Sequence, residues 1–235
     1  MKNPIVIFYH IYCFAHQYNN WEDTVKEQLQ KLIDSGLYDA CAKMFVRIIG
    51  SVENIEKYYN IVSSMDKIKT ICADNNNDRE TTTLEAAHKY AKENSNTNIL
   101  YIHTKGVHSG FNRRQKYTIK ANDWRHLMEY FLVENWVQCV KQLEDGYDAC
   151  GINWRFTEFF EDVLGHFSGN FWWARSSYLK LLPEIKRSKH RGEQEFWIGR
   201  CSPKVCCLYE SGLNHYRSYY PREFYVNKES FCEKT

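Results

Sequence analysis

Short runs of β-branched and aromatic residues alternate along this chain with longer segments in which apolar residues recur every three or four positions. The first pattern predicts buried strands and the second predicts amphipathic helices. The expected strands are Ile5–Tyr12, Met44–Ile49, Lys69–Ala73, Asn98–His103, Asp148–Ile152 and Val205–Tyr209, with an extended segment at Phe167–Ala174. The expected helices are Trp21–Asp34, Thr82–Glu93, Asn122–Leu143, Ser176–Leu182 and Gly192–Arg200. This alternation predicts an α/β fold in which a mainly parallel sheet carries helices on both faces.

Polar residues and glycine mark the ends of two of these helices. Asn20 is the predicted N-cap of the first helix, and Gly36 follows that helix as a C-terminal cap. Thr82 and Glu85 have the spacing of a capping box at the start of the second helix. These signals predict where the loops between the first strands lie.

The composition excludes several classes of protein. Among 235 residues, 31 Lys and Arg face 29 Asp and Glu, and a net charge of +2 argues against a dedicated nucleic-acid binder. No apolar run is long enough for a membrane span. The length fits one domain, for which we expect a core over about residues 4–210 and an aromatic C-terminal tail over residues 211–235.

The cysteines favour a reducing compartment. There are nine, an odd number, no two are spaced as CxxC, and no signal peptide precedes them. We therefore expect free thiols and a cytoplasmic location. Cys201, Cys206, Cys207 and His215 are close in sequence, but their spacing matches no zinc motif, and we expect no zinc site there.

The most informative polar residues follow the strand Asn98–His103. Ligands of parallel sheets bind at the carboxyl ends of the strands, and this strand runs directly into Thr104, Lys105 and Gly106. Lys and His can face an anion there, and glycine lets the backbone approach closely. The alternative is a solvated turn. The segment is not a P-loop, because no glycine-rich stretch precedes the lysine.

Several motifs occur in the order seen in one known family. YIHTKG, residues 101–106, is followed by Trp124-Arg125, by GINW at residues 151–154, by HFSGNFWWA at residues 166–174, and by EFWIG at residues 195–199. Over residues 5–200 the chain resembles a small GT-A-type glycosyltransferase domain. The resemblance implies a GT-A-like, Rossmann-like mixed sheet. It also implies transfer of a sugar from a UDP- or GDP-type nucleotide-sugar donor to a hydroxyl acceptor on a glycan or other molecule.

The resemblance further implies a nucleotide pocket at the strand ends. An aromatic ring such as that of Tyr12 can stack on the base, and Glu80 can accept hydrogen bonds from the base or ribose. The expected donor residues are His10, Ile11, Tyr12, Glu80, Thr83, His103, Thr104 and Gly106. The alternative makes His10 and Tyr12 ordinary strand residues and Glu80 a solvated loop carboxylate.

One departure from the family pattern concerns the metal. Many GT-A enzymes hold Mn²⁺ or Mg²⁺ with an Asp-x-Asp motif, and this chain has His103-Thr104-Lys105 at that place. Hard divalent cations prefer carboxylate oxygens. We expect Lys105 to neutralise the leaving diphosphate directly, so that no metal is needed. The alternative is that Asp74 or Asp78 reaches a metal from the neighbouring loop.

The acceptor side is expected around the HFSGNFWWA motif. Aromatic faces beside amides and hydroxyls suit a carbohydrate. The expected acceptor residues are Trp154, Ser168, Gly169, Asn170, Trp172 and Arg191, and the alternative is that the aromatic ones are core. Glu195 is the candidate general base for a transfer that inverts configuration. His215 and Arg217 of the tail are expected to close over the diphosphate.

Two other functions remain open from the sequence. The first is a catalytically inactive domain that keeps the fold and binds carbohydrate or nucleotide. The second is a cysteine hydrolase using Cys13 with His16 or His103, although no cysteine lies in a glycine-flanked nucleophile elbow.

Overall fold

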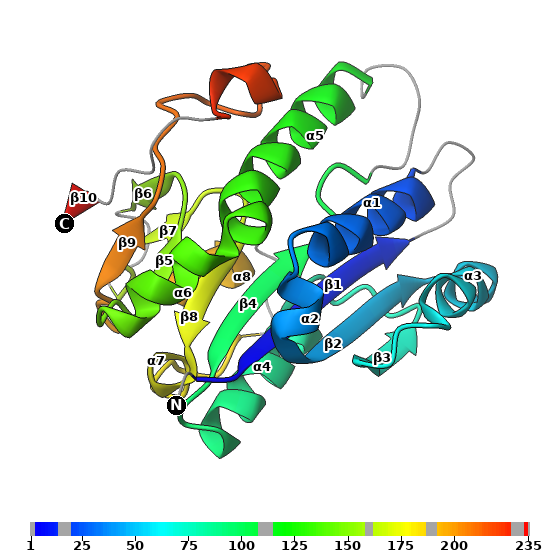
Figure 1. Ribbon diagram of the computed structural model, residues 1–235, viewed down its shortest axis with the longest axis horizontal. Coiled ribbons are helices and arrows are strands. Elements are labelled where there is room, and N and C mark those ends of the chain that lie inside the picture. Colours follow the sequence, from blue (N-terminus) through cyan, green and yellow to red (C-terminus); the bar gives the residue numbers. More distant parts are fainter. Residues whose placement is uncertain are drawn as a thin grey trace.

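A computed structural model describes residues 3–13, 20–107, 115–157, 162–186, 192–226 and 233–234. Its centre is an eight-stranded sheet with the order β10-β9-β5-β8-β4-β1-β2-β3 (Figure 1). The strands are Ile5–Cys13 (β1), Cys41–Gly50 (β2), Ile68–Asp74 (β3), Asn98–His103 (β4), Ala149–Gly151 (β5), Trp172–Arg175 (β8), Val205–Cys207 (β9) and Glu233–Lys234 (β10). A two-stranded sheet pairs Trp154–Phe156 (β6) with Gly165–Phe167 (β7).

The sheet is mainly parallel. β1 pairs in parallel with β2 and β4, β2 with β3, and β5 with β9, whereas β8 runs antiparallel between β4 and β5. Parallel neighbours bring their carboxyl ends to one edge, and His10 of β1 is the register partner of His103 of β4. The predicted α/β class, with its mainly parallel mixed sheet, is confirmed.

Helices cover both faces of the sheet. They are Trp21–Asp34 (α1), Leu37–Ala40 (α2), Val52–Val62 (α3), Thr81–Glu93 (α4), Gln115–Glu129 (α5), Trp136–Glu144 (α6), Ser176–Leu179 (α7) and Gly192–Phe196 (α8), with 3-10 turns at Trp197–Gly199 (η2) and Arg222–Phe224 (η3). In Figure 1, α1, α5 and α6 lie in front of the sheet and α4 lies behind it. None of the helices in these ranges combines the length and the apolar character that a membrane span requires.

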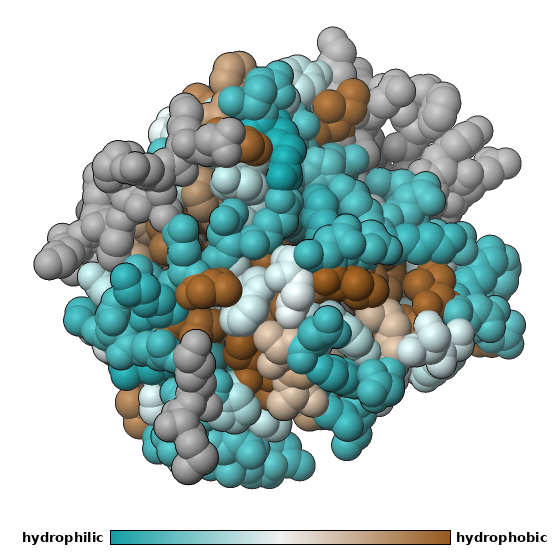
Figure 2. Space-filling model, in the orientation of Figure 1, coloured by the Kyte–Doolittle hydropathy of each residue, from teal (hydrophilic) through white to brown (hydrophobic). Residues whose placement is uncertain are grey.

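Two hydrophobic cores follow from the alternation of side chains along the central strands. In β1, Ile7 and Tyr9 face the core beneath α1 and α5, whereas Val6 and Phe8 face the core beneath α4 and α7. The outside of the molecule is correspondingly polar. In the view of Figure 2 it is mostly hydrophilic, with hydrophobic side chains in small patches.

Several local expectations were wrong or incomplete. The expected single helix over 122–143 is interrupted by a π-helical turn, Tyr130–Glu134 (η1), and Asn135 ends that turn by donating its backbone and side-chain N–H to the Tyr130 carbonyl. The side chain of Asn20 makes no cap hydrogen bond. The capping box at Thr82 is also absent, because α4 begins at Thr81 and the Thr82 hydroxyl donates to Asp78 instead.

Two further differences affect the site. Helix α3 was not expected, although Ser51 caps it by accepting a hydrogen bond from the backbone N–H of Asn54. The expected continuous segment Phe167–Ala174 is divided by a turn, in which Gly169 and Asn170 have φ values of +97° and +58°. That turn points residues 168–170 toward the carboxyl edge of β4.

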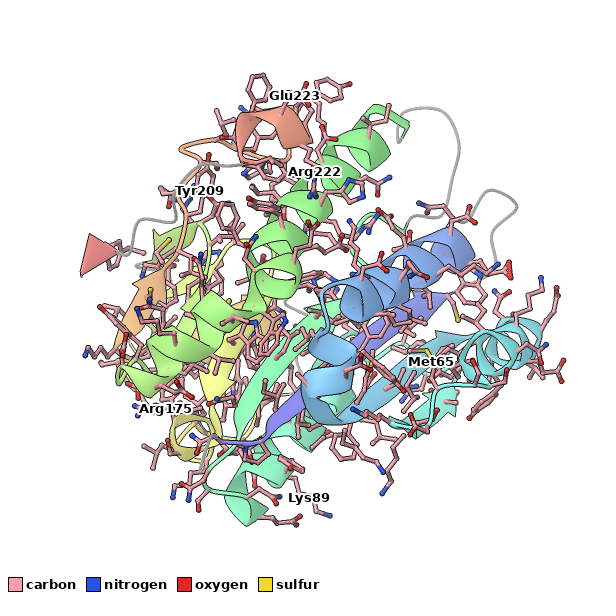
Figure 3. The ribbon with its side chains drawn as sticks, in the orientation of Figure 1. Met65, Lys89, Arg175, Tyr209, Arg222 and Glu223 are labelled. Carbon is pink, nitrogen blue, oxygen red and sulfur yellow. The ribbon has the colours of Figure 1, made fainter. Side chains whose placement is uncertain are left out.

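The segment after β9 packs against the long helix in front of the sheet. The ring of Tyr209 stacks on Phe131 at a centroid distance of 4.6 Å, and Arg222 donates to Glu134 at 2.7 and 2.5 Å. Figure 3 shows Tyr209 and Arg222 at the two ends of this segment, which follows the helix. Residues 209–226 are therefore docked on α5 and η1, beside the carboxyl edge of the sheet.

Candidate functional site

A cavity of about 260 Å³ opens at the carboxyl ends of β1 and β4. It is called the strand-end cavity here. Its lining residues are His10, Tyr12, Asn77, Arg79, Glu80, His103, Thr104, Lys105, Gly106 and Val107. The cations Arg79 and Lys105 face it together with the carboxylate of Glu80, so the cavity has the groups to hold an anion and a hydroxyl-bearing ligand.

The strand ends are locked by hydrogen bonds that also hold the cavity floor. Thr104 donates its backbone N–H to the His10 carbonyl at 3.0 Å, and its hydroxyl accepts from the backbone N–H of Tyr12 at 2.9 Å. His10 Nδ1 lies 2.8 Å from the Thr83 hydroxyl. Burial, with the positive charge of Arg47, lowers the pKa of His10 to about 3. His10 is therefore a neutral part of the floor at pH 7.

Lys105 is the most buried cation of this cavity. Its side chain is 7% exposed, and its Nζ lies 3.8 Å from the centroid of the Trp124 ring on α5. A cation over an indole face is attracted by the ring quadrupole. The next residue, Gly106, has φ +91°, and a Cβ there would lie 2.4 Å from Asn122 Oδ1. Glycine is therefore required for this turn to pass beneath α5.

A small pocket of about 10 Å³ brings together residues far apart in sequence. It is called the bridging pocket, and it is lined by Glu80, His103, Lys105, Gly169, Asn170 and Glu195. His103 Nε2 donates to the Gly169 carbonyl at 3.0 Å, which fixes the 168–170 turn against β4. The two residues expected to carry chemistry, Lys105 and Glu195, thus line one pocket.

A third cavity of about 530 Å³ lies on the other side of Trp124. It is called the aromatic cavity. Its lining residues are Trp124, Arg155, Ser168, Glu210, Gly212, Leu213, Asn214, His215 and Tyr216. The His215 ring stacks on Trp124 at 5.4 Å, and Tyr216 meets the same indole edge-on at 4.9 Å. Trp124 therefore connects this cavity to Lys105.

Asp74 and Asp78 both pair with the same arginine. Arg47, whose side chain is 1% exposed, lies between them and pairs with Asp74 at 2.7 Å and with Asp78 at 3.7 Å. Partial burial acts to raise the pKa of Asp74, but hydrogen bonds from Cys72 and Arg47 outweigh it and lower that pKa. Both carboxylates neutralise a buried guanidinium, which argues against the alternative that either one reaches a metal, and that alternative stays a prediction.

One group among the described residues has the geometry of a metal site, and sequence reasoning missed it. Glu27, His126 and Glu129 bring their ligand atoms within 4.8 Å of one another between α1 and α5. Arg125 pairs with both carboxylates, at 2.7 and 2.9 Å, and Lys31 lies 2.6 Å from Glu129. Two cations already balance the two carboxylates, so the cluster is an ion-pair network that joins the helices.

Several expected site residues lie elsewhere. Ile11 is fully buried in the core beneath α1, and Thr83 is buried with its hydroxyl on His10. The ring of Trp172 is fully buried against Tyr101, and Trp154 is buried against Phe167, so neither ring offers a face to a ligand. Trp172 instead donates to Asn170 Oδ1 at 3.1 Å and supports the turn. Arg191 lies outside the described residues.

The cysteine alternative also fails at its nucleophile. Cys13 is buried beneath Gly50, and burial raises the pKa of its thiol to about 12. A thiol with that pKa carries almost no thiolate at neutral pH. His16, its proposed partner, lies outside the described residues.

Sequence reasoning missed several lining residues. Arg79 was overlooked although it stands next to Glu80 in the same loop. Arg155 and Glu210 come from distant segments and pair at 2.6 Å, which no local pattern reveals. Trp124 was expected only as part of the Trp124-Arg125 motif, and Tyr216 only as part of the aromatic tail. Their aromatic character was the available signal, but the contact between them depends on the tertiary fold.

Comparison with solved structures shows similarity of chain path only. The crystal structure of 4-diphosphocytidyl-2C-methyl-D-erythritol synthase from Anaerococcus prevotii DSM 20548 superposes with a TM-score of 0.46 at 9% identity, over 95% of each chain. A second structure of a synthase of that name gives 0.40 at 9% identity, over 80% of this chain and 84% of that one. Neither similarity bears on activity.

Comparison of sequences gives the family. No curated protein matches the chain. Residues 8–215 match the model of a domain of unknown function (DUF8361), and this range includes all three cavities except the rim at Tyr216. The chain therefore belongs to the DUF8361 family.

Proposed function

We propose that this protein is a glycosyltransferase that moves a sugar from a UDP- or GDP-type nucleotide sugar to a hydroxyl acceptor. The observation that carries the proposal is the bridging pocket. Lys105, Glu80 and Glu195 line it together, and it lies between a cavity with cationic walls and a cavity with aromatic walls. A group transfer between two bound molecules needs this arrangement, because both reactants must meet at one point.

The strand-end cavity supports the donor half of the proposal. Lys105 and Arg79 match the charge of a diphosphate, Tyr12 supplies an aromatic ring for the base, and Glu80 supplies an acceptor for base or ribose N–H and O–H groups. The carboxyl edge of a mainly parallel sheet is where such ligands bind.

The proposed chemistry is an inverting displacement. Glu195 accepts the proton of the acceptor hydroxyl as its oxygen forms a bond to the anomeric carbon of the sugar. The bond from that carbon to the diphosphate oxygen breaks with its electron pair, and the ammonium of Lys105 balances the charge on the leaving diphosphate. Asp74 and Asp78 do not fit a metal, because Arg47 occupies both, and no step is assigned to one.

Direct titration tests the donor site. The ligands are UDP, GDP, UDP-glucose, UDP-N-acetylglucosamine and GDP-mannose. Calorimetry measures the affinity of each one, and thermal shift measures how far it raises the melting temperature. A ligand at 100 times its Kd adds about 2.7 kcal/mol to the free energy of unfolding. Lys105→Ala should weaken nucleotide binding. The matched control Lys204→Ala removes another lysine that lies over an aromatic ring, Tyr147 at 4.5 Å, but lines none of the three cavities.

The result also separates the two remaining functions. Binding with slow donor hydrolysis or transfer supports the enzyme. Binding with no turnover under any acceptor supports the inactive binding domain. Absence of binding by all five ligands at millimolar concentration would remove the proposal.

A further inference from the structure

The aromatic cavity is a separate binding site with its own chemistry. It has about twice the volume of the strand-end cavity, 530 against 260 Å³, and shares none of its lining residues. Its walls come from α5, from β6, from the 168–170 turn and from the segment 210–216. A donor in the strand-end cavity leaves this space for a second molecule.

The described wall of this cavity carries no net charge. Arg155 is the one cation among the described lining residues, and its Nη1 lies 2.6 Å from Glu210 Oε2. Burial, with the positive charges of Arg155 and Lys105, lowers the pKa of His215 to about 4, so its ring is neutral at pH 7. An anion entering this cavity would have to compete with Glu210 for Arg155.

The wall offers aromatic surface and neutral polar groups. Tyr216 is 42% exposed at the rim, beside Leu213. Ser168 and Asn214 add a hydroxyl and an amide, and the paired Arg155 and Glu210 present donors and acceptors side by side. Vicinal hydroxyls can bond to such a pair at once, and apolar ring faces pack on aromatic side chains.

Two polar atoms of the same wall are buried without a partner in the described part of the chain. Trp124 Nε1 and His215 Nδ1 have no hydrogen-bond partner among the described residues. Both residues are at least nine-tenths buried. Both atoms are enclosed by the wall itself, so the hydrogen bonds to a ligand come from the polar lining groups of Ser168, Asn214, Arg155 and Glu210.

We propose that the aromatic cavity binds a neutral, hydroxyl-rich saccharide and discriminates against acidic sugars, with Arg155, Glu210 and Tyr216 as its specificity-determining residues. Its description as the acceptor site rests on the proposed function. Trp124 forms the partition between the two sites, with Lys105 over its ring and His215 stacked on it. A saccharide in this cavity has its hydroxyls next to Ser168. The following residue, Gly169, lines the bridging pocket, so the two sites adjoin at this turn.

Saturation-transfer NMR with matched sugars tests the proposal. The probes are methyl β-glucoside, methyl β-galactoside and methyl α-mannoside, each compared with the uronic acid that differs only at C6. We expect at least one neutral glycoside to bind more tightly than its uronic acid. Tyr216→Ala should weaken its binding by about three- to tenfold, the range of one aromatic contact. The control Tyr219→Ala removes a ring that is 47% exposed but lies outside the cavity lining.

Glu210→Gln gives the sharpest test of specificity. The amide keeps the shape and the Oε1 acceptor for the backbone N–H of Gly212, but it leaves Arg155 without a counter-charge. The preference should then shift toward the uronic acid by about three- to tenfold. Equal binding of neutral and acidic sugars by the wild type, unchanged preference in Glu210→Gln, or no binding of any neutral glycoside would overturn the inference.

The outcome is separable from that of the proposed function. UDP binding without saccharide binding contradicts only the assignment of the aromatic cavity. Saccharide binding that Tyr216→Ala weakens, without any nucleotide binding, contradicts the transferase and leaves the saccharide site in place.

Discussion

The ammonium nitrogen of Lys105 lies 3.8 Å from the centroid of the Trp124 ring, at the partition between the strand-end cavity and the aromatic cavity. One residue follows a central strand and the other lies on the helix that crosses the sheet. The indole fixes a flexible four-carbon side chain at the point where the two cavities meet. A preorganised charge acts on a reaction without a further cost of reorganisation.

Lys105→Ala should lower the turnover number by roughly 10²–10³-fold, by analogy with removal of one preorganised donor to a developing negative charge. The charge on the diphosphate grows in the transition state, so the loss falls mainly on the chemical step. The affinity for a neutral saccharide should change little. EDTA should leave the wild type active. Steady-state rates measured with and without the chelator check both statements. Loss of activity in EDTA, together with a near-normal Lys105→Ala variant, would contradict them.

Glu195→Gln should reduce transfer by about 10²–10⁴-fold while nucleotide affinity stays nearly constant. The amide has the shape of the carboxylate but cannot accept the acceptor's proton. Glu184→Gln is the control, because Glu184 is a highly exposed carboxylate on a surface loop. Single-turnover kinetics and nucleotide titration separate the two effects. A normal rate in the Gln variant would point to a different base or to a retaining mechanism.

Asp74→Asn should lower the free energy of unfolding by about 1–3 kcal/mol. Removing one partner of a fully buried ion pair lowers the free energy of unfolding by more than this. The change is smaller at this position because Asp74 is partly exposed and Asp78 remains beside Arg47. Urea unfolding measures the change, with Asp34→Asn as an exposed control. If Asp74 serves only to pair with Arg47, Mn²⁺ should not raise the melting temperature of the wild type. Metal stabilisation that Asp74→Asn removes would restore the metal interpretation.

The stability should fall as the pH decreases below about 6.5. His10 has its ordinary pKa of 6.5 in the unfolded chain and a pKa of about 3 in the fold, so between these values only the unfolded state binds the proton. Each decrease of one pH unit within that window then lowers the free energy of unfolding by about 1.4 kcal/mol through this residue. His10→Gln should give a shallower dependence in urea titrations between pH 4 and pH 6.5, about 1.4 kcal/mol less per unit. The same slope in both proteins would show that His10 titrates normally.

The alternation of strands and helices was readable from the sequence, because strands buried on both faces appear as continuous apolar runs. Helix α1 occupies the predicted residues, and Gly36 follows it with φ +71°. The second expected helix starts one residue before Thr82, although its capping box does not form. The π-helical turn at Tyr130–Glu134 was not predictable, because it depends on how the helix packs over β8 and against the C-terminal segment.

The sequence alone also pointed to the carboxyl edge of the sheet, where the strand-end cavity lies, and to Lys105 and Glu195, which line one pocket. The binding of a ligand there and the chemical roles of the two residues stay predictions. It could not separate aromatic residues that line a cavity from those of the core, because Trp124, Trp154 and Trp172 look alike in a linear pattern. It also could not show that Arg47 occupies Asp74 and Asp78, or that Arg155 is paired with Glu210. Those contacts join residues 27 to 55 positions apart, and only the pairing of β2 with β3 and the packing of the C-terminal segment beside β6 bring their charges together.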